Sequence, residues 1–158
     1  MKTKSAGGTE RLKRALAEVS AKSVQVGFFD TAQYPDGTPV AYVAAIQEFG
    51  YPQGNIPARP FMRPTVKARE LPWAKQVAGV MMGVIKGEVT AQHGFEQVGA
   101  LAAGDIARAI SKVVSPPLEK STLQARQSRK KTPGVSKKPL VDTGLMIQSV
   151  TYQVEEKS

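Results

Sequence analysis

The sequence contains no cysteine, and it has only one histidine and one tryptophan among its 158 residues. Without cysteine the chain cannot form disulfides, zinc–thiolate sites, iron–sulfur clusters or a catalytic thiol. A single histidine, His93, cannot build a histidine-based metal site, and we expect it to lie on the surface. These absences exclude several common classes of enzyme and metalloprotein.

Long hydrophobic runs are also missing. The most apolar stretch, residues 77–85, is rich in glycine and far shorter than the roughly 20 residues that span a bilayer. Residues 1–8 are basic and polar, with no apolar run behind them, so a signal peptide is not expected. We therefore predict a protein that is not secreted and does not contact a membrane.

Sequence motifs for catalysis are sparse. No phosphate-binding loop, dinucleotide-binding glycine motif or G-x-S-x-G element occurs. The triplet Asp142-Thr143-Gly144 has the form of an aspartic-protease motif, but only fourteen residues follow it, too few for the β-rich fold that such a site needs. We expect Asp142 to cap a helical turn that runs to Gln148, and Asp105 to pair with Arg108 or Arg59. The sequence predicts no catalytic residue, no cofactor and no metal.

Positive charge is concentrated in two segments. The formal net charge is +9 at pH 7. Residues 1–14 carry five Lys or Arg against Glu10 alone, and residues 120–138 carry seven with no acid, so the remainder of the chain is close to neutral. Segments of this kind are often solvated arms, and they also suit contact with DNA phosphates. Both interpretations are open.

Apolar residues recur at helical spacing in several segments. Residues 10–19 predict a short amphipathic helix, and two long helices are predicted at about 72–87 and 94–114. Residues 40–49 fit a helix better than a strand, with Gly50 as the C-terminal stop.

Alternating apolar residues predict strands near 23–30 and 149–155. Between the first strand and the helix at 40–49, Tyr34-Pro35-Asp36-Gly37 has the composition of a turn. We therefore predict an α+β fold in one domain over 1–158, with a small sheet in which the first and last strands pair.

The proline-rich segment at 50–64 is the least ordinary part of the sequence. Its prolines disfavour a helix at the preceding residues, so we expect extended chain, with Pro64 in the first turn of a helix and Pro72 at the start of the next. A stiff strip of this kind loses little entropy on docking. It is an interface strip, a strut packed on its own domain, or both at once, and a ligand for an SH3-type domain is a weaker alternative. The interface residues predicted here and on the last strand are Arg59, Pro60, Phe61, Arg63 and Tyr152.

Residues 115–139 are predicted to form an extended basic loop, with at most one short helical turn around 122–129 and a tip at 132–134. Its side chains are the candidate contacts to DNA or to an acidic partner: Lys120, Arg126, Arg129, Lys130, Lys131, Lys137 and Lys138.

Four segments, in order, resemble the neck and tail-completion proteins of tailed bacteriophages, similar to the minor tail protein Z type. Residues 45–50 (A-I-Q-E-F-G) and 56–64 (I-P-A-R-P-F-M-R-P) resemble the E-F-G … I-P-x-R-P-F-x-R-P signature of that family. Residues 104–118 and 138–152 are similar to its later segments. The basic stretch at 124–138 is longer and more charged than the family pattern, and Pro72 interrupts a helix that the pattern continues from Pro64.

The resemblance implies a structural protein of the virion neck or tail, assembled in the host bacterial cytoplasm, that is not an enzyme. Such proteins form a ring at the head–tail junction, around the DNA path, and complete the tail so that it joins the capsid connector. It further implies a homo-oligomer, a hexamer by analogy with tail rings or alternatively a dodecamer, with connector, tail-terminator or tube proteins as neighbours and packaged DNA in the lumen. The alternative is a small basic module that binds DNA independently of sequence.

Overall fold

A computed structural model describes residues 5–130 and 136–157 of the chain. The chain divides into two compact units, each assembled from separate segments. The first contains the described residues of 1–26, 69–102 and 152–158, and the second contains 27–68 and the described residues of 103–151. The prediction of a single domain over 1–158 stays a prediction.

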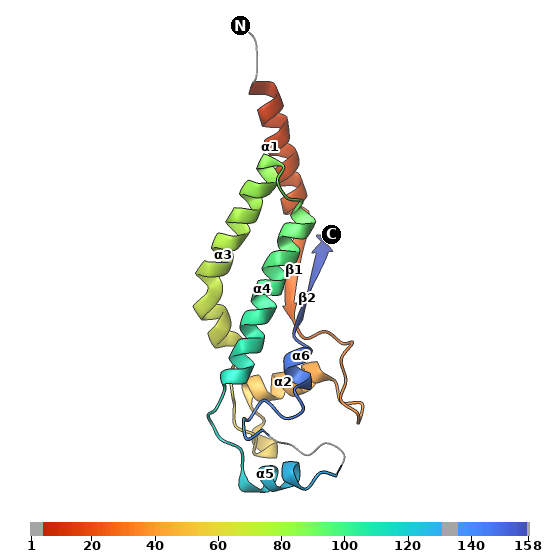
Figure 1. The fold of residues 1–158 in the computed structure, drawn as a ribbon, viewed down its shortest axis with the longest axis vertical. Helices are drawn as coiled ribbons and strands as arrows, with labels where there is room; N and C mark the ends of the chain where they lie inside the picture. Colours follow the sequence, from red (N-terminus) through yellow and green to blue (C-terminus); the bar gives the residue numbers. More distant parts are fainter. Residues whose placement is uncertain (1–4, 131–135, 158) are drawn as a thin grey trace. The chain divides into compact units, whose positions relative to one another are not determined.

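The fold is α+β, as predicted: the described residues form helices and a two-stranded antiparallel sheet. The elements, labelled in Figure 1, are α1 (Ser5–Ser20), β1 (Lys22–Gly27), α2 (Val40–Phe49), the 3₁₀ helix η1 (Pro52–Gly54), α3 (Met62–Lys86), α4 (Ala91–Lys112), α5 (Lys120–Gln127), α6 (Leu145–Gln148) and β2 (Thr151–Glu156).

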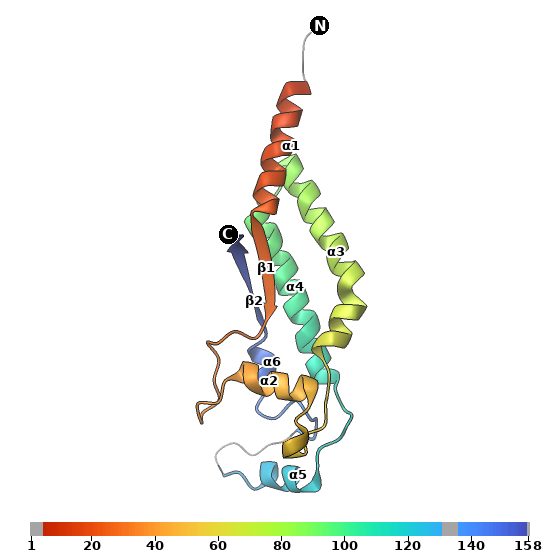
Figure 2. The ribbon, with the colours of Figure 1, turned by 180° about the vertical axis from the view of Figure 1, so that it is seen from behind.

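The core of the first unit forms where three helices and the sheet meet. Its buried side chains are Ala15 of α1, Val80 and Val84 of α3, and Ala91, Phe95 and Val98 of α4. Val24 of β1 and Val154 of β2 pack against the same cluster. Figures 1 and 2 show the two strands running beside α4 within this unit. Burial of these apolar groups is the main stabilising contribution to the unit.

The predicted pairing of the first and last strands is confirmed. β1 and β2 are hydrogen-bonded to each other, and the Lys157 N–H donates to the Ala21 carbonyl at 2.7 Å. The first strand is shorter than predicted and ends at Gly27. The next residue, Phe28, packs edge-on against Phe61, with the ring centroids 6.0 Å apart. That contact belongs to the second unit.

Two glycines of α4 allow close approach in the first unit. A Cβ on Gly94 would lie 2.2 Å from Val80 Cγ1, and a Cβ on Gly99 would lie 2.6 Å from the ring of Tyr152. Both distances are too short for real side-chain contacts. α3 and β2 therefore pack directly on the α4 backbone at these two points.

The second unit has its own apolar core. Its buried residues come from α2, α4, α6 and the connecting segments: Val40, Ala44, Phe61, Ala103, Ile106, Ile110, Leu140 and Met146. The predicted helix at 40–49 is confirmed as α2. It ends as expected at Gly50, whose φ is +79° and whose N–H donates to the Ile46 carbonyl at 2.7 Å. The predicted turn at 34–37 is also confirmed, since the Gly37 N–H donates to the Tyr34 carbonyl.

The predicted helix break at Pro72 is wrong. α3 is one helix from Met62 to Lys86, with Pro72 inside it. Proline already has a helical φ, and its direct cost is the loss of one hydrogen bond and crowding of the preceding turn, about 3 kcal/mol. The later turns of α3 are anchored in the core by Val80 and Val84. We attribute the continuity of the helix to that packing.

Other boundaries also differ from the sequence prediction, including the start of α1 at Ser5 and of β2 at Thr151. The proline-rich segment is not extended throughout, because η1 forms at Pro52–Gly54, and α3 begins at Met62. The basic loop holds the two-turn helix α5. Helix α4 runs from Ala91 to Lys112 rather than 94–114, and the Ala91 N–H donates to the Glu18 carboxylate at 2.9 Å. A contact from a distant helix of this kind leaves no local signal in the sequence.

Asp142 does not cap α6, which corrects another prediction. The N-cap position of α6 is Gly144, with φ at +81° and no side-chain cap hydrogen bond. The Leu145 N–H donates instead to the Thr143 hydroxyl at 3.3 Å. The Asp142 carboxylate is drawn away by two arginines, described below.

We predict that Gly94→Ala destabilises the protein by about 1–3 kcal/mol, because the new methyl group overlaps the stiff side chain of Val80. Gly104→Ala, in the same helix, is the matched control, since its Cβ would meet only the flexible end of Arg108 at 3.6 Å. This control should be neutral or up to about 1 kcal/mol more stable. Urea denaturation of both variants measures the difference, and equal stabilities would contradict the close packing.

Candidate functional site

The Glu48 carboxylate lies at the start of helix α3 and organises the motif-bearing part of the second unit. Oε2 accepts the N–H groups of Phe61 and Met62 at 2.7 and 2.8 Å, and Oε1 accepts the N–H of Arg63 at 3.1 Å. The Arg63 guanidinium donates to Oε1 at 2.8 Å through Nε. The first N–H groups of a helix have no partner within it, and they favour a nearby negative charge. Glu48 therefore caps α3 from the end of another helix.

Glu48 is buried, yet its pKa is lowered from the usual 4.5. Burial is the largest single influence, and by itself it would raise the pKa. The guanidinium of Arg63 and the three backbone N–H groups together outweigh it. The carboxylate is thus held in its charged form, and that charged form stabilises the fold.

Arg59 ties the proline-rich segment to two other parts of the second unit. Its Nη1 donates to the Gln47 side chain at 3.2 Å, and its Nε and Nη2 donate to the carbonyls of Pro116 and Pro117 at 2.8 and 3.0 Å. The Arg59 N–H donates to the Gln47 carbonyl at 2.6 Å. Burial, and secondarily the charge of Arg126, lowers the pKa of Arg59. An arginine still remains protonated at neutral pH.

Gly50 makes this return of the chain possible. Its φ of +79° favours glycine, and a Cβ there would lie 2.9 Å from the Ala58 nitrogen. The two halves of the E-F-G … I-P-x-R-P-F-x-R-P pattern are therefore in direct contact. They are joined by Glu48, Arg59 and Arg63.

The five predicted interface residues differ in how far they are buried. Arg59 and Phe61 are buried, which confirms that the strip packs on its own unit. Pro60 and Arg63 are exposed, and the Arg63 guanidinium also lies 4.7 Å from the ring centroid of the exposed Phe49. Tyr152 is half-buried against Gly99 in the first unit. An interface role for Pro60 and Arg63 stays a prediction.

Arg126 performs a second structural task that the sequence does not reveal. This residue of α5 is buried, and its guanidinium donates to the carbonyls of Ser136, Lys138, Val141 and Pro139 at 3.0–3.3 Å. Its Nε also lies 3.6 Å from Asp142, which forms a second, shorter ion pair with Arg129. Arg126 is thus turned toward the protein's own backbone and not toward solvent.

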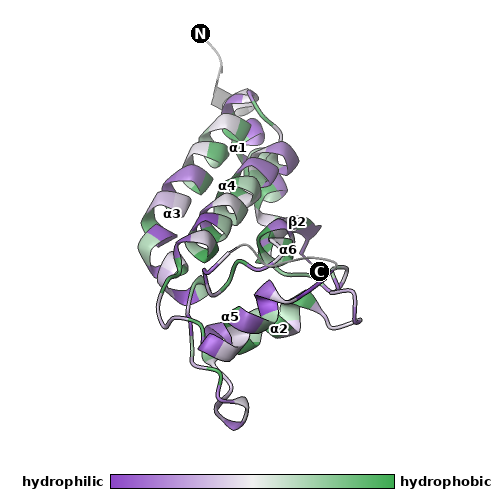
Figure 3. Cartoon of the chain, turned by 60° about the horizontal axis from the view of Figure 1, so that its bottom comes forward, coloured by the Kyte–Doolittle hydropathy of each residue, from purple (hydrophilic) through white to green (hydrophobic). Residues whose placement is uncertain are grey.

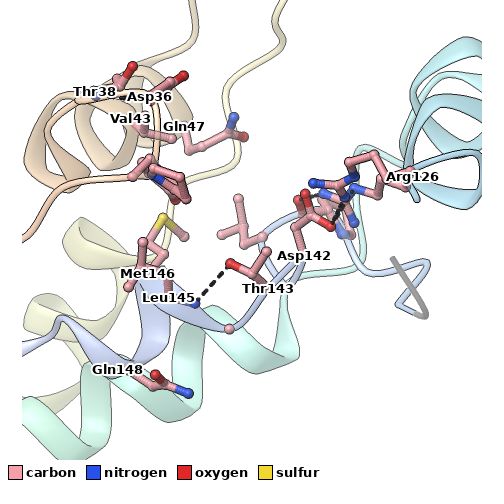
Figure 4. Close-up of a pocket in the computed structure, with 16 residues that line it drawn as sticks. Asp36, Thr38, Val43, Gln47, Arg126, Asp142, Thr143, Leu145, Met146 and Gln148 are labelled. Atoms are coloured by element: carbon pink, nitrogen blue, oxygen red, sulfur yellow. Dashed lines mark hydrogen bonds and ion pairs between the residues drawn. The ribbon is translucent and has the colours of Figure 1, made fainter. Parts of the chain in front are cut away.

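A cavity of about 780 Å³ opens beside this cluster (Figure 4). Val43 and Gln47 of α2 line it from one direction and Leu145 and Met146 from the other, with Arg126 and Asp142 at its side. Tyr34 also lines it, and burial, followed by the charges of Asp142 and Asp36, raises the pKa of this phenol. The lining combines apolar side chains with amides and a neutralised acid–base cluster.

The remaining basic candidates lie on the surface of the second unit. Lys120, Lys130 and Lys137 are exposed, as is Lys138, whose ammonium donates to the Ser111 carbonyl at 2.9 Å. Figure 3 shows hydrophilic residues over much of α5. Lys131 lies outside the described residues. The charge offered to a partner is therefore smaller than the sequence count suggests, because Arg126 and Arg129 are committed to Asp142.

The residues raised as possible catalytic or metal-binding groups have ordinary surroundings. Asp105 pairs with Arg108, as expected. His93 is exposed, as expected, near Glu96 and Gln97. In the described ranges, no group of three His, Cys, Asp or Glu side chains could hold a metal ion, and no helix has the length and apolar character needed to cross a membrane.

Sequence reasoning missed Glu48 and Asp142 as organising residues. In the sequence, Glu48 stands out only as part of the family-like motif. The three backbone N–H groups that donate to it lie 13 to 15 positions further along the chain. The only sequence signal for such a role is that the proline-rich segment contains arginines but no acidic residue, so an acidic partner must come from elsewhere in the chain.

Comparisons with known protein families, curated proteins and solved structures found no match for this chain.

We predict that Glu48→Gln lowers the stability at pH 7 by about 2–4 kcal/mol, because an amide cannot accept all four donors. A carboxyl whose pKa is lowered on folding stabilises the folded state above its unfolded pKa, and this contribution disappears as the pH falls through the folded pKa. The difference between wild type and variant should therefore be constant near neutral pH and shrink below about pH 4.5. Chemical denaturation across pH measures it. Glu88→Gln, at an exposed ion pair, should change little, and an equal effect there would refute the special role of Glu48.

We further predict that Arg126→Lys destabilises the protein by about 2–4 kcal/mol, because one ammonium cannot reach four carbonyls that a planar guanidinium serves. Amide hydrogen exchange within residues 136–142 should speed up. Lys130→Met removes an exposed charge nearby and should stay within about 0.5 kcal/mol of wild type. Unchanged exchange in the Arg126→Lys variant would argue against this role.

Proposed function

We propose that this chain is a structural virion protein that forms a ring at the head–tail junction of a tailed bacteriophage. In this role it completes the tail and joins it to the capsid connector, around the path of the DNA. Six copies are the preferred number and twelve the alternative. Connector, tail-terminator or tube proteins are its neighbours, and the proposal includes no enzymatic activity.

The observation that carries the proposal is how the two halves of the family-like signature meet. Glu48 accepts hydrogen bonds from the backbone of Phe61 to Arg63, while Gln47 contacts Arg59. Residues that interact so closely form one structural motif, which gives the resemblance a physical basis. This supports the assignment more strongly than four separate matches along a sequence would.

Exposed apolar side chains give independent support for assembly. In the first unit Leu71, Ala78 and Met82 share one face of α3 by their spacing, and Leu71 is 74% exposed. In the second unit Phe49 and Val114 are 66% and 65% exposed. Exposed apolar side chains that share one helix face are available to be buried in subunit contacts. Ring contacts join different surfaces of neighbouring copies and require surface of this kind.

The exposed lysines fit a protein placed around DNA. Lys120, Lys130 and Lys137 can contact phosphates without reading sequence, which suits a lumen through which a genome passes. The same surface is the basis of the alternative, a small DNA-binding module. The two proposals differ in whether the chain is part of the particle.

Cryo-electron microscopy of particles from the phage that encodes the chain tests the proposal directly. We expect density for this fold as a closed ring between head and tail. Complete particles without the chain would refute the virion role, and the DNA-binding module would then become the leading proposal.

We predict that the triple variant Lys120→Glu/Lys130→Glu/Lys137→Glu weakens duplex DNA binding and flattens its salt dependence, since each lost phosphate contact lowers the slope of log K against log salt by about 0.9. A matched variant, Lys67→Glu/Lys75→Glu/Lys86→Glu, changes the net charge equally at exposed positions of α3. Fluorescence anisotropy in a salt series measures both. Equal losses in the two variants would show that net charge alone acts, and not this surface.

A further inference from the structure

The sheet of this protein has two strands and two open edges. β1 hydrogen-bonds to β2, and in the described part of the chain neither strand has a second partner. Except for its end residues Gly27 and Thr151, the sheet belongs to the first unit. Figure 2 shows the pair beside α4. Isolated two-stranded sheets are marginally stable, and open edges present unpaired N–H and C=O groups.

This sheet is nevertheless held firmly on one face. Val24 and Val154 pack on the core of the first unit, and the Tyr152 ring rests on Gly99. Side chains on the other face, including Gln25, Gln153 and Glu155, are exposed. The strands are thus pre-ordered before any partner arrives, which lowers the entropy cost of adding a further strand.

The edges lack one device that proteins use against strand addition. Neither strand contains proline, which would remove a ladder donor. The charges present are of opposite sign on the two strands, with Lys22 at the start of β1 and Glu155 and Glu156 at the end of β2. The charge on a β1 edge therefore repels another β1 edge and attracts a β2 edge.

Within one chain, these side chains of β1 and β2 already contact each other. The Lys22 ammonium lies 3.3 Å from Glu156, and the Gln25 amide donates to Glu155 at 3.0 Å. The Glu156 side chain is still 82% exposed, so it has room for a second cation.

We propose that the β1 edge of one copy pairs antiparallel with the β2 edge of the next copy, so that a continuous sheet joins neighbouring subunits. This inference rests on the proposed ring, and it names the contact between its copies. Each new junction would place Lys22 and Gln25 of one copy near Glu156 and Glu155 of the next. Pairing of two β2 edges would repeat neither. Because the contact joins two different surfaces, it propagates around a ring instead of ending at a dimer.

Because the chain has no cysteine, an introduced cysteine is the only thiol that a crosslinker can react with. Gln25→Cys and Glu155→Cys are made as separate full-length variants, one of them with a mass tag, so that no chain can crosslink within itself. A short thiol-specific crosslinker is added to each variant alone and to their mixture, at a concentration at which wild type assembles. Lys130→Cys, exposed on the second unit, replaces one partner in a control mixture.

We expect mixed dimers of the two variants at several times the level of the control mixture, and few dimers from either variant alone. Dimers within one variant, or a mixture no better than the control, would overturn the inference. Wild-type rings in micrographs together with a failed crosslink would leave the ring standing and refute this contact. Mixed dimers from a chain that is absent from virions would support the contact and refute the neck function.

Discussion

A single buried carboxylate organises the motif-bearing part of this chain. Glu48 ends helix α2 and accepts the first N–H groups of helix α3, together with the guanidinium of Arg63. Removing a carboxylate from water is costly, and four donors offset that cost only if all of them converge. That requirement determines where α3 starts. It also requires the proline-rich segment to fold back onto α2, through a turn at Gly50. The interaction is therefore a geometric constraint on three consecutive elements as well as a source of stability.

Arginine also holds the irregular loops of the second unit together. Proline-rich and loop segments leave carbonyl groups without helix or sheet partners, and buried carbonyls need donors. Arg59 supplies them at Pro116 and Pro117, and Arg126 supplies them between Ser136 and Val141. In a chain without disulfides, these planar side chains cross-link loops through several hydrogen bonds each. Counting basic residues in the sequence consequently overstates the charge that is available to a partner.

The sequence predicted those features that depend on neighbours along the chain. Helix α2 with its glycine stop, the turn at Gly37 and the two strands follow from spacing and turn chemistry. It failed where a distant side chain decides the local structure. Glu48 sets the start of α3, Glu18 meets the start of α4, and Arg126 and Arg129 draw Asp142 away from α6. Arg59 and Phe61 look like exposed strip residues in the sequence because no local pattern shows that they are buried.

The polar contacts that are satisfied within the chain also affect how copies of it would assemble. The strongest polar contacts of the second unit are satisfied within the chain, so partners there meet exposed lysines and scattered apolar side chains. The sheet of the first unit differs, because in the described residues neither of its strands has a second strand partner. Apolar contacts supply affinity but little direction, whereas a strand edge fixes both orientation and register. The proposed ring would need such a directional element, and the edge of the sheet is the part of the described chain that could supply it.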